Sequence, residues 1–372
     1  MHAVEDEHDG MAAGVCVATD KSGQDRCVVV VKGTFALEGR GDARLAEVQE
    51  PLVSADVHRG DPGTTSLHFE CDFAPFKPRA DILVVGHAVS PSGKPVTESV
   101  VTLEFGALRK VIRVTGDRRW ERGLLGLRAS APQPFIQMPL VYERAFGGTD
   151  LSHSDPRHHG AELRNPVGVG YRKNPDARAA EGTLLPNLED PRQPISNWKD
   201  VSRPMGFGPI GRNWQPRISH AGTYDQRWMD EERPFLPRDF DTPYFLSAPE
   251  DQQVPYLQGG ESLRCTGMTR DGALVARVPR LRFPVTFRFD GGDQSLEPLL
   301  DTLLVDADSR RMMLTWRASV PLGRKPARLR EVLVGHQPVR LPPGRGEGKR
   351  HFKSLAEAVA AHRALQRRAG RS

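Results

Sequence analysis

Residues 186–258 constrain the fold more than any other part of the chain. They contain eleven prolines and ten of the 25 aromatic residues, yet their apolar positions follow neither the 3.6-residue period of a helix nor the 2-residue period of a strand. Disordered segments are poor in aromatic residues, so this segment is expected to fold against a scaffold. Because proline fixes φ, eleven prolines lower the entropy lost on folding. We therefore predict a rigid, irregular central region over residues 149–262.

Such a region cannot pair its backbone polar groups in regular ladders, so side chains must supply the partners. The side chains suited to this task are Arg212, Asn213, Gln215, Arg217, Asp225, Gln226, Asp239, Asp241, Asp251 and Gln252.

The flanking regions are rich in strand patterns, and they show no alternation of strands with helices that would indicate a parallel sheet. The chain is therefore predicted to be mainly β (β-rich α+β), with antiparallel sheets or a sandwich. Asp271-Gly272 indicates a type I′ hairpin turn. The predicted strands and hairpins cover residues 27–37, 81–89, 97–105, 107–116, 263–278, 283–289 and 302–318.

These patterns divide the chain into five parts. We expect a flexible N-terminus (1–23), an N-terminal β region (24–148), the central region (149–262), a C-terminal β region of the same domain (263–323) and a basic tail (324–372). Within the tail, Ser354 and Glu357 form a capping box, which predicts a helix over about 354–368.

Composition limits the location of the protein. The opening sequence MHAVEDEHDG is acidic and lacks the features of a secretory signal, and no run of apolar residues is long enough to span a membrane. The four cysteines are widely spaced without a CxxC pair, as in proteins of a reducing compartment. We expect a cytoplasmic protein with free thiols and no membrane span.

The net charge of +5 is unevenly distributed. Residues 324–372 contain thirteen Lys or Arg and three Glu, a balance of +10, which leaves about −5 for residues 1–323. A basic tail can contact nucleic acid, lipid head groups or an acidic protein, or it can be a solvated extension, which is the simplest interpretation. Phe352 is its one aromatic residue, so the sequence gives no indication of a base-stacking surface.

Two motifs suggest a bound ligand but lack the required context. Glycines at 206, 208 and 211 fit G-x-G-x-x-G, but no apolar strand precedes them and Pro209 interrupts the motif, so no nucleotide cofactor is predicted. The histidines at 153, 158 and 159 fit no zinc spacing, so no metal is predicted.

Carboxylates among aromatic residues are the main indication of catalysis. In a carbohydrate-active hydrolase, one such carboxyl group acts as the acid and another as the base or nucleophile. Each can equally pair with a nearby arginine or cap loop backbone, and this structural use is the favoured interpretation. No catalytic residue is assigned. The carboxylates concerned are Asp225, Asp239, Asp241 and Asp251.

A series of motifs gives a more specific indication. In chain order they are KGTF (32–35), PLVYERAFGG (139–148), NPVGVGY (165–171), LPNLEDP (185–191), GFGPIGRNWQPR (206–217), GTYDQRW (222–228), PFLPRDFD (234–241) and SAPEDQQ (247–253). With these motifs in this order, the chain resembles a family of domains of formerly unknown function that are encoded in bacterial type VI secretion gene clusters.

The resemblance implies a non-enzymatic cytoplasmic adaptor or chaperone. Its partners would be a toxic effector and the secretion spike, made of a valine-glycine repeat protein and a PAAR-type tip. The alternative is a carbohydrate-active hydrolase or sugar-binding protein. The residues expected to be signature or partner-contact positions are Arg212, Asn213, Trp214, Arg217, Tyr224, Asp225, Trp228, Asp239, Asp251 and Gln252.

Overall fold

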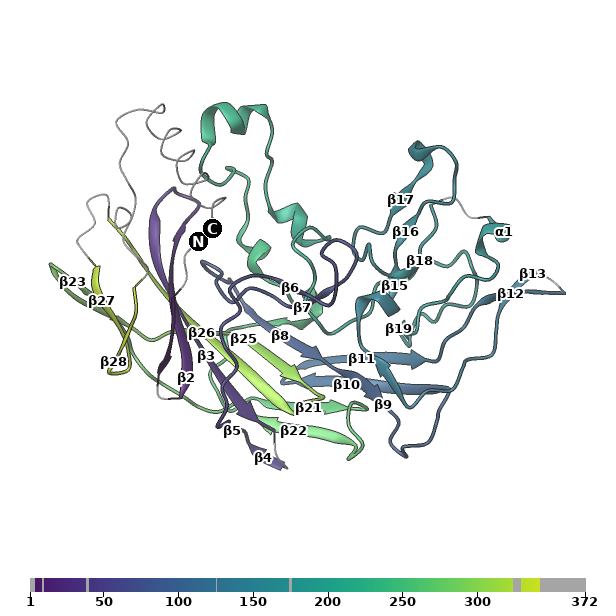
Figure 1. The fold of residues 1–372 in the computed structure, drawn as a ribbon, viewed down its shortest axis with the longest axis horizontal. Coiled ribbons are helices and arrows are strands. Elements are labelled where there is room, and N and C mark those ends of the chain that lie inside the picture. Colours follow the sequence, from purple (N-terminus) through teal and green to yellow (C-terminus); the bar gives the residue numbers. More distant parts are fainter. Residues whose placement is uncertain are drawn as a thin grey trace, which may run out of the picture.

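The computed structural model describes residues 4–8, 10–37, 40–124, 126–173, 176–323 and 329–341. Most regular structure is β, and most strand pairs are antiparallel (Figure 1). The prediction of a mainly β fold is therefore confirmed. The helix predicted over 354–368 lies outside the described residues.

The largest sheet has eight strands. Seven follow the order β1-β2-β3-β26-β25-β8-β20, and β5 pairs with β3 off this path. Neighbours are antiparallel except for β8 and β25, which are parallel, in contrast to the expected all-antiparallel pairing. The strands are β1 (Val4–His8), β2 (Met11–Thr19), β3 (Asp25–Ala36), β5 (Arg44–Leu45), β8 (Ala80–Val85), β20 (Gln253–Val254), β25 (Leu299–Asp306) and β26 (Arg311–Pro321).

A second sheet has six strands in the order β19-β11-β10-β21-β22-β4. Its hairpins β10–β11 and β21–β22 occur where alternating patterns and Asp271-Gly272 predict them. Gly272 has a φ of 93°, a conformation that glycine adopts without strain. The strands are β4 (Arg40–Asp42), β10 (Glu98–Phe105), β11 (Leu108–Thr115), β19 (Leu188–Glu189), β21 (Ser262–Thr266) and β22 (Ala273–Arg277).

A third sheet of four strands, in the order β24-β23-β27-β28, contains part of the expected basic tail. Val332 and Val334 are buried in it, because alternate residues of β27 face the core. The expectation that the tail begins at residue 324 is therefore wrong for residues 329–339. The strands are β23 (Val285–Phe289), β24 (Gly292–Leu296), β27 (Leu329–Val334) and β28 (Gln337–Val339).

The remaining elements are short, and many of them lie within the central region of residues 149–262. The strands form the pairs β6 (Val57–His58) with β7 (Leu67–Phe69), β9 (His87–Val89) with β14 (Gln137–Pro139), β12 (Trp120–Gly123) with β13 (Gly126–Ala129), β15 (Phe146–Gly147) with β18 (Val169–Gly170), and β16 (Thr149–Asp150) with β17 (Gly160–Ala161). The helical turns are η1 (Tyr142–Arg144), η2 (Pro156–His158), α1 (Ala177–Ala180), η3 (Arg217–His220), the π-helical turn η4 (Trp228–Glu232), η5 (Thr242–Phe245) and η6 (Glu250–Gln252).

One hydrophobic cluster joins the three large sheets. Ile82 of β8, Leu103 of β10 and Phe287 of β23 all belong to it and are fully buried. On the opposite face of the largest sheet, segments without regular structure complete the burial: Leu52 packs on β3 and Ala248 on β8. Burial on both faces explains why β3 and β8 are continuous apolar runs rather than alternating ones.

The N-terminal part differs from expectation. Residues 11–19 form β2, which pairs with β3 and buries side chains on both faces, so the flexible segment expected over residues 1–23 is wrong for this stretch. The acidic sequence at the N-terminus led us to expect an exposed segment. The small residues Ala12, Ala13 and Gly14, however, let β2 pack closely on both of its faces. All four cysteines are free, as expected.

Within the described residues, none of the helical segments has the length and apolar character needed to cross a bilayer.

Candidate functional site

The segment 206–217, named here the signature segment, is fixed to the body by close backbone contacts. A Cβ atom on Gly206 would lie 2.7 Å from Cε1 and Cζ of Tyr142, so only glycine fits against this ring. The Tyr142 hydroxyl donates to the carbonyl oxygen of Gly208 at 3.2 Å. The backbone N–H of Val84 in β8 donates to the carbonyl oxygen of Phe207 at 3.1 Å. These contacts replace the regular ladder that the segment lacks.

Arg217, the last residue of the signature segment, holds that end of the segment in place with a buried side chain. Its side chain is 2% exposed, and its Nη1 donates to the Ile210 carbonyl oxygen at 2.7 Å. Its Nε and Nη2 donate to the Tyr244 carbonyl oxygen, and Nη2 lies 2.5 Å from Oε1 of Glu70. One guanidinium thus ties together three parts of the chain that share no strand.

Glu70 is the centre of a buried group of charges. Burial opposes its charged form, but Arg217, Lys77 and Arg212 outweigh this effect and keep the pKa of Glu70 below its ordinary value. Lys77 also donates to the fully buried Asp81 at 2.7 Å. Burial disfavours the charged form of Lys77, and these two carboxylates overcome it and raise its pKa. The charges are therefore paired inside the fold.

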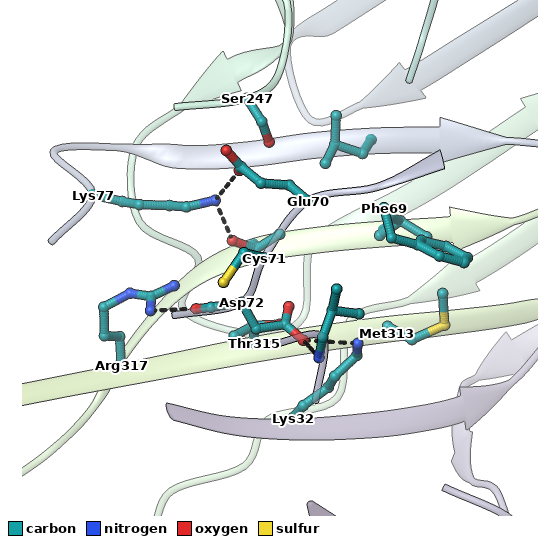
Figure 2. A pocket seen from close by; sticks show the side chains of 14 residues that line it. Lys32, Phe69, Glu70, Cys71, Asp72, Lys77, Ser247, Met313, Thr315 and Arg317 are labelled. Carbon is teal, nitrogen blue, oxygen red and sulfur yellow. Dashed lines mark hydrogen bonds and ion pairs between the residues drawn. The ribbon is translucent and has the colours of Figure 1, made fainter. Parts of the chain in front are cut away.

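Figure 2 shows the cavity beside this group, with Glu70, Lys77, Asp72 and Arg317 pointing toward it. Its volume is about 30 Å³, which is the space of a single water molecule. Oε2 of Glu70 has no hydrogen-bond partner among the described residues. A space of this size can hold a water that completes the hydrogen bonding, but no larger ligand.

Gln252 fixes the signature segment from its other side. The fully buried amide donates from Nε2 to the carbonyl oxygens of Ile82 and Phe207, at 2.6 and 2.9 Å. Its Oε1 accepts a hydrogen bond from Nζ of Lys110 at 2.8 Å. Lys110 Nζ also donates to Oδ1 of Asp251 at 2.8 Å, and burial lowers the pKa of Lys110 to about 8 despite this partner.

A larger pocket of about 300 Å³ lies between the signature segment and the β6–β7 loop. Residues 211–214 form one wall, and Val167 adds an apolar contact. The opposite wall comes from residues 56–67, including Asp56 and His58. Arg212 Nε donates to Oδ2 of Asp56 at 3.1 Å and so joins the two walls. This volume is at the lower end of the range for ligand sites.

Residues 222–240, named here the arm, extend away from the strands of the largest sheet (Figure 1). Asp239 accepts hydrogen bonds from the backbone N–H and the hydroxyl of Thr223, at 2.9 and 2.7 Å. Asp225 accepts from the backbone N–H of Trp228 at 2.9 Å, and the rings of Trp228 and Tyr224 meet edge to face. Local bonds therefore hold the shape of the arm.

Comparison with known families assigns the chain. The model of a family described as an uncharacterized protein conserved in bacteria, DUF2169, matches residues 22–317. The chain belongs to this family. No curated protein and no solved structure matches it.

The DUF2169 region contains all ten residues proposed from the sequence, and the structure separates them into groups with different environments. Trp214, Arg217 and Gln252 are buried, and Trp214 packs edge to face on Tyr142. Arg212 and Asn213 join Trp214 at the 300 Å³ pocket. Asp251 pairs with Lys110 at the edge of the core. The remaining four belong to the arm and are Tyr224, Asp225, Trp228 and Asp239.

The carboxylates that suggested a hydrolase have structural partners in the DUF2169 fold. Asp225 and Asp239 bind backbone N–H groups of the arm, and Asp241 accepts from the backbone N–H of Thr242. None of the four lines either of the cavities described above. In the part of the chain that the structure describes, no group of three or more His, Cys, Asp or Glu is placed to hold a metal ion.

Sequence reasoning missed the partners that the DUF2169 fold brings to the signature segment. Glu70, Asp81, Asp56 and His58 all come from residues 56–81, which have no strong periodicity. One of these residues could have been found from the sequence. Asp81 begins the apolar run DILVV, and a charged side chain buried with such a run requires a partner.

Proposed function

We propose that this DUF2169 protein is a cytoplasmic adaptor or chaperone that helps load a toxic effector onto the type VI secretion spike. The partners would be the effector and either the valine-glycine repeat protein or the PAAR-type tip. The motif order described above supports this role, and the family match to residues 22–317 includes all of these motifs.

The observation that carries the proposal is the surface of the arm. Tyr224 is 53% exposed, and Met229 and Phe235 are each 47% exposed. Aromatic and methionine side chains are enriched at the centres of protein interfaces. Exposed together on one projecting segment, they form a surface suited to burial by a partner rather than to contact with water.

The arm is also held in place before any partner binds. Its base is closed by the backbone hydrogen bond from Asp241 to the His220 carbonyl oxygen, at 2.9 Å. Lys21, in the β2–β3 turn, donates from Nζ to the Phe240 carbonyl oxygen at 2.8 Å. A preformed surface loses less conformational entropy on binding, so more of the contact energy contributes to affinity.

Co-purification tests the proposal. The protein is expressed with the effector and spike proteins encoded beside it, and the complex is isolated under native conditions. We expect Tyr224→Ala combined with Phe235→Ala to weaken the complex at least tenfold, roughly 1.4 kcal/mol or more. Val201→Ala is the matched control, because Val201 is 74% exposed but lies outside the arm. No complex with the unaltered protein would refute the adaptor role.

The proposal includes no catalytic step, because three of the candidate carboxylates accept hydrogen bonds from backbone N–H groups of the arm and its base. The fourth, Asp251, pairs with Lys110. Asp225→Asn and Asp239→Asn test this directly in the alternative, a carbohydrate-active hydrolase. Loss of glycan turnover in either variant, with the fold intact, would favour the hydrolase over the adaptor.

A further inference from the structure

The pocket beside Trp214 contains hydrogen-bond donors that the protein itself does not use. Trp214 is 4% exposed, and its Nε1–H has no partner among the described residues. A Cβ atom on Gly211 would lie 3.0 Å from this nitrogen, so the indole edge lies at the glycine wall of the pocket. Nε1 is not one of the fully buried atoms that lack a partner, so its N–H is accessible to an acceptor in the pocket.

A second unused polar group lies beside the indole. The side chain of Asn213 is exposed, lines the pocket and donates to no described residue. Its Oδ1 would also lie 3.0 Å from a Cβ atom on Gly211, so both groups border the same small residue.

The opposite wall offers an acceptor. Nδ1 of His58 lies 3.1 Å from the carbonyl oxygen of Thr65, and a carbonyl can only accept, so Nδ1 carries the proton. In the neutral imidazole, Nε2 then has the free lone pair. The pocket therefore combines donors on one wall with an acceptor on the other.

Its charges are already balanced. Arg212 pairs with Asp56 and lies 3.3 Å from Oε1 of Glu70. Both oxygens of Asp56 are engaged, one by Arg212 and the other by the backbone N–H of Cys71. An anionic ligand would meet the Asp56 carboxylate, and a cationic ligand would find both oxygens of Asp56 already engaged. A neutral ligand is favoured.

Carbohydrate fits the pocket less well than an amide does. Sugars stack on an exposed aromatic face, and Trp214, at 4% exposure, offers no such face. A peptide group has one carbonyl acceptor and one N–H donor, which match the indole or Asn213 amide and Nε2 of His58.

We propose that this pocket binds the main-chain amide of an extended peptide segment from a partner protein. The apolar walls formed by Leu67 and Val167 would contact a side chain next to that amide. This inference deepens the proposed function by naming the ligand chemistry of one surface. It rests on that function only for the source of the peptide.

The test uses the isolated full chain, so it is independent of any effector. The probe is N-acetyl-glycyl-glycine N-methylamide, which carries only main-chain groups. The readout is the indole ¹H–¹⁵N NMR signal of Trp214, assigned by its loss in Trp214→Phe. We expect the signal to shift and saturate with this probe, and to remain unchanged with acetate or methyl glucoside.

A matched pair of glycine variants locates the binding. Gly211→Ala places a methyl group against Trp214 and Asn213 and should weaken binding about tenfold or more. Gly208→Ala is the control, because its Cβ would meet no atom closer than 3.9 Å. Asn213→Ala, which removes no side-chain hydrogen bond among the described residues, should weaken binding severalfold.

Three results would overturn the proposal. The Trp214 signal could stay fixed up to the solubility limit of the peptide, respond only to the glucoside or to acetate, or shift equally in Gly211→Ala. The unaltered indole signals of the other tryptophans report that each variant is folded. A failed co-purification with effector and spike would leave this titration unaffected, so the two proposals fail separately.

Discussion

Arg217 and Glu70 are 147 positions apart in the chain, yet Nη2 of Arg217 lies 2.5 Å from Oε1 of Glu70 in the protein interior. Both side chains are almost fully buried, at 2% and 7% exposure. The same guanidinium binds the carbonyl oxygens of Ile210 and Tyr244. This pair therefore holds the signature segment and the chain after the arm against the segment that follows β7.

Loss of Arg217 should destabilise the whole fold. Arg217→Met removes the cation, leaves Glu70 with less compensation and leaves two backbone carbonyls without donors. We expect the free energy of unfolding to fall by about 3–5 kcal/mol, as is typical when one partner of a buried ion pair is removed. Urea denaturation followed by tryptophan fluorescence measures this change.

Arg238→Met is the control for that experiment. Arg238 also pairs with carboxylates, Glu231 and Glu232, but its side chain is 67% exposed. Exposed ion pairs contribute about 0–1 kcal/mol, so this variant should remain near the unaltered protein. Equal losses in both variants would contradict a special role for the buried pair.

Gly206 should tolerate no side chain. Its Cβ would overlap the ring of Tyr142 at 2.7 Å, and Tyr142 is itself buried. We expect Gly206→Ala to lower the free energy of unfolding by about 1–3 kcal/mol, the usual cost of overpacking. In the same urea assay, Gly208→Ala should change it by less than about 0.5 kcal/mol. The reverse order would contradict the close packing of Gly206 on the Tyr142 ring.

Stability should increase with pH in the alkaline range because of Lys110. Burial lowers its pKa to about 8, whereas an unfolded lysine titrates near about 10.4. Between these values the unfolded chain binds more protons at this site, so this contribution to stability rises with pH. Relative to Lys110→Met, the unaltered protein should gain about 2 kcal/mol in free energy of unfolding between about pH 8 and 10.

Lys199→Met controls for the simple loss of a positive charge, since Lys199 is exposed. Its difference from the unaltered protein, measured over the same pH range, gives the effect of losing one exposed positive charge. A pH-independent difference for Lys110→Met would mean that Lys110 is solvated in the folded state.

The arm should depend on Asp239 for its shape. Asp239→Ala removes both hydrogen bonds to Thr223, and we expect trypsin to cleave after Arg227 severalfold faster, because local opening becomes easier. Asp230→Ala is the comparison within the arm, since among the described residues Asp230 accepts only from the side chain of Gln226. Mass spectrometry of the early fragments gives the two rates. Unchanged cleavage in Asp239→Ala would show that other contacts hold the arm.

Local patterns in the sequence predict most of the strands but not how they are joined. The alternation in residues 97–105 and Asp271-Gly272 predict hairpins because a hairpin is specified by adjacent residues. The parallel pairing of β8 with β25 joins strands more than 200 residues apart. No local pattern specifies such a contact. The same limit explains why local patterns alone do not identify β2 and β27 as core strands.

The candidate site shows a similar division. The identity of Arg217 and Gln252 as important polar residues follows from their place in an irregular segment with many prolines. Whether each is buried or available to a partner depends on Glu70 and Lys110, which come from distant strands and loops. The pocket depends on the β6–β7 loop in the same way.

The order of strands in the largest sheet has a consequence for synthesis on the ribosome. β26 lies between β3 and β25 in the sheet. β3 (residues 25–36) therefore cannot pair along its second edge until β26 (residues 311–321) has been synthesised. Until then a nascent chain exposes the apolar, unpaired edge of β3, which is a template for association with other chains. Contacts this distant in sequence make folding slow, so the chain must be nearly complete before its central sheet can close.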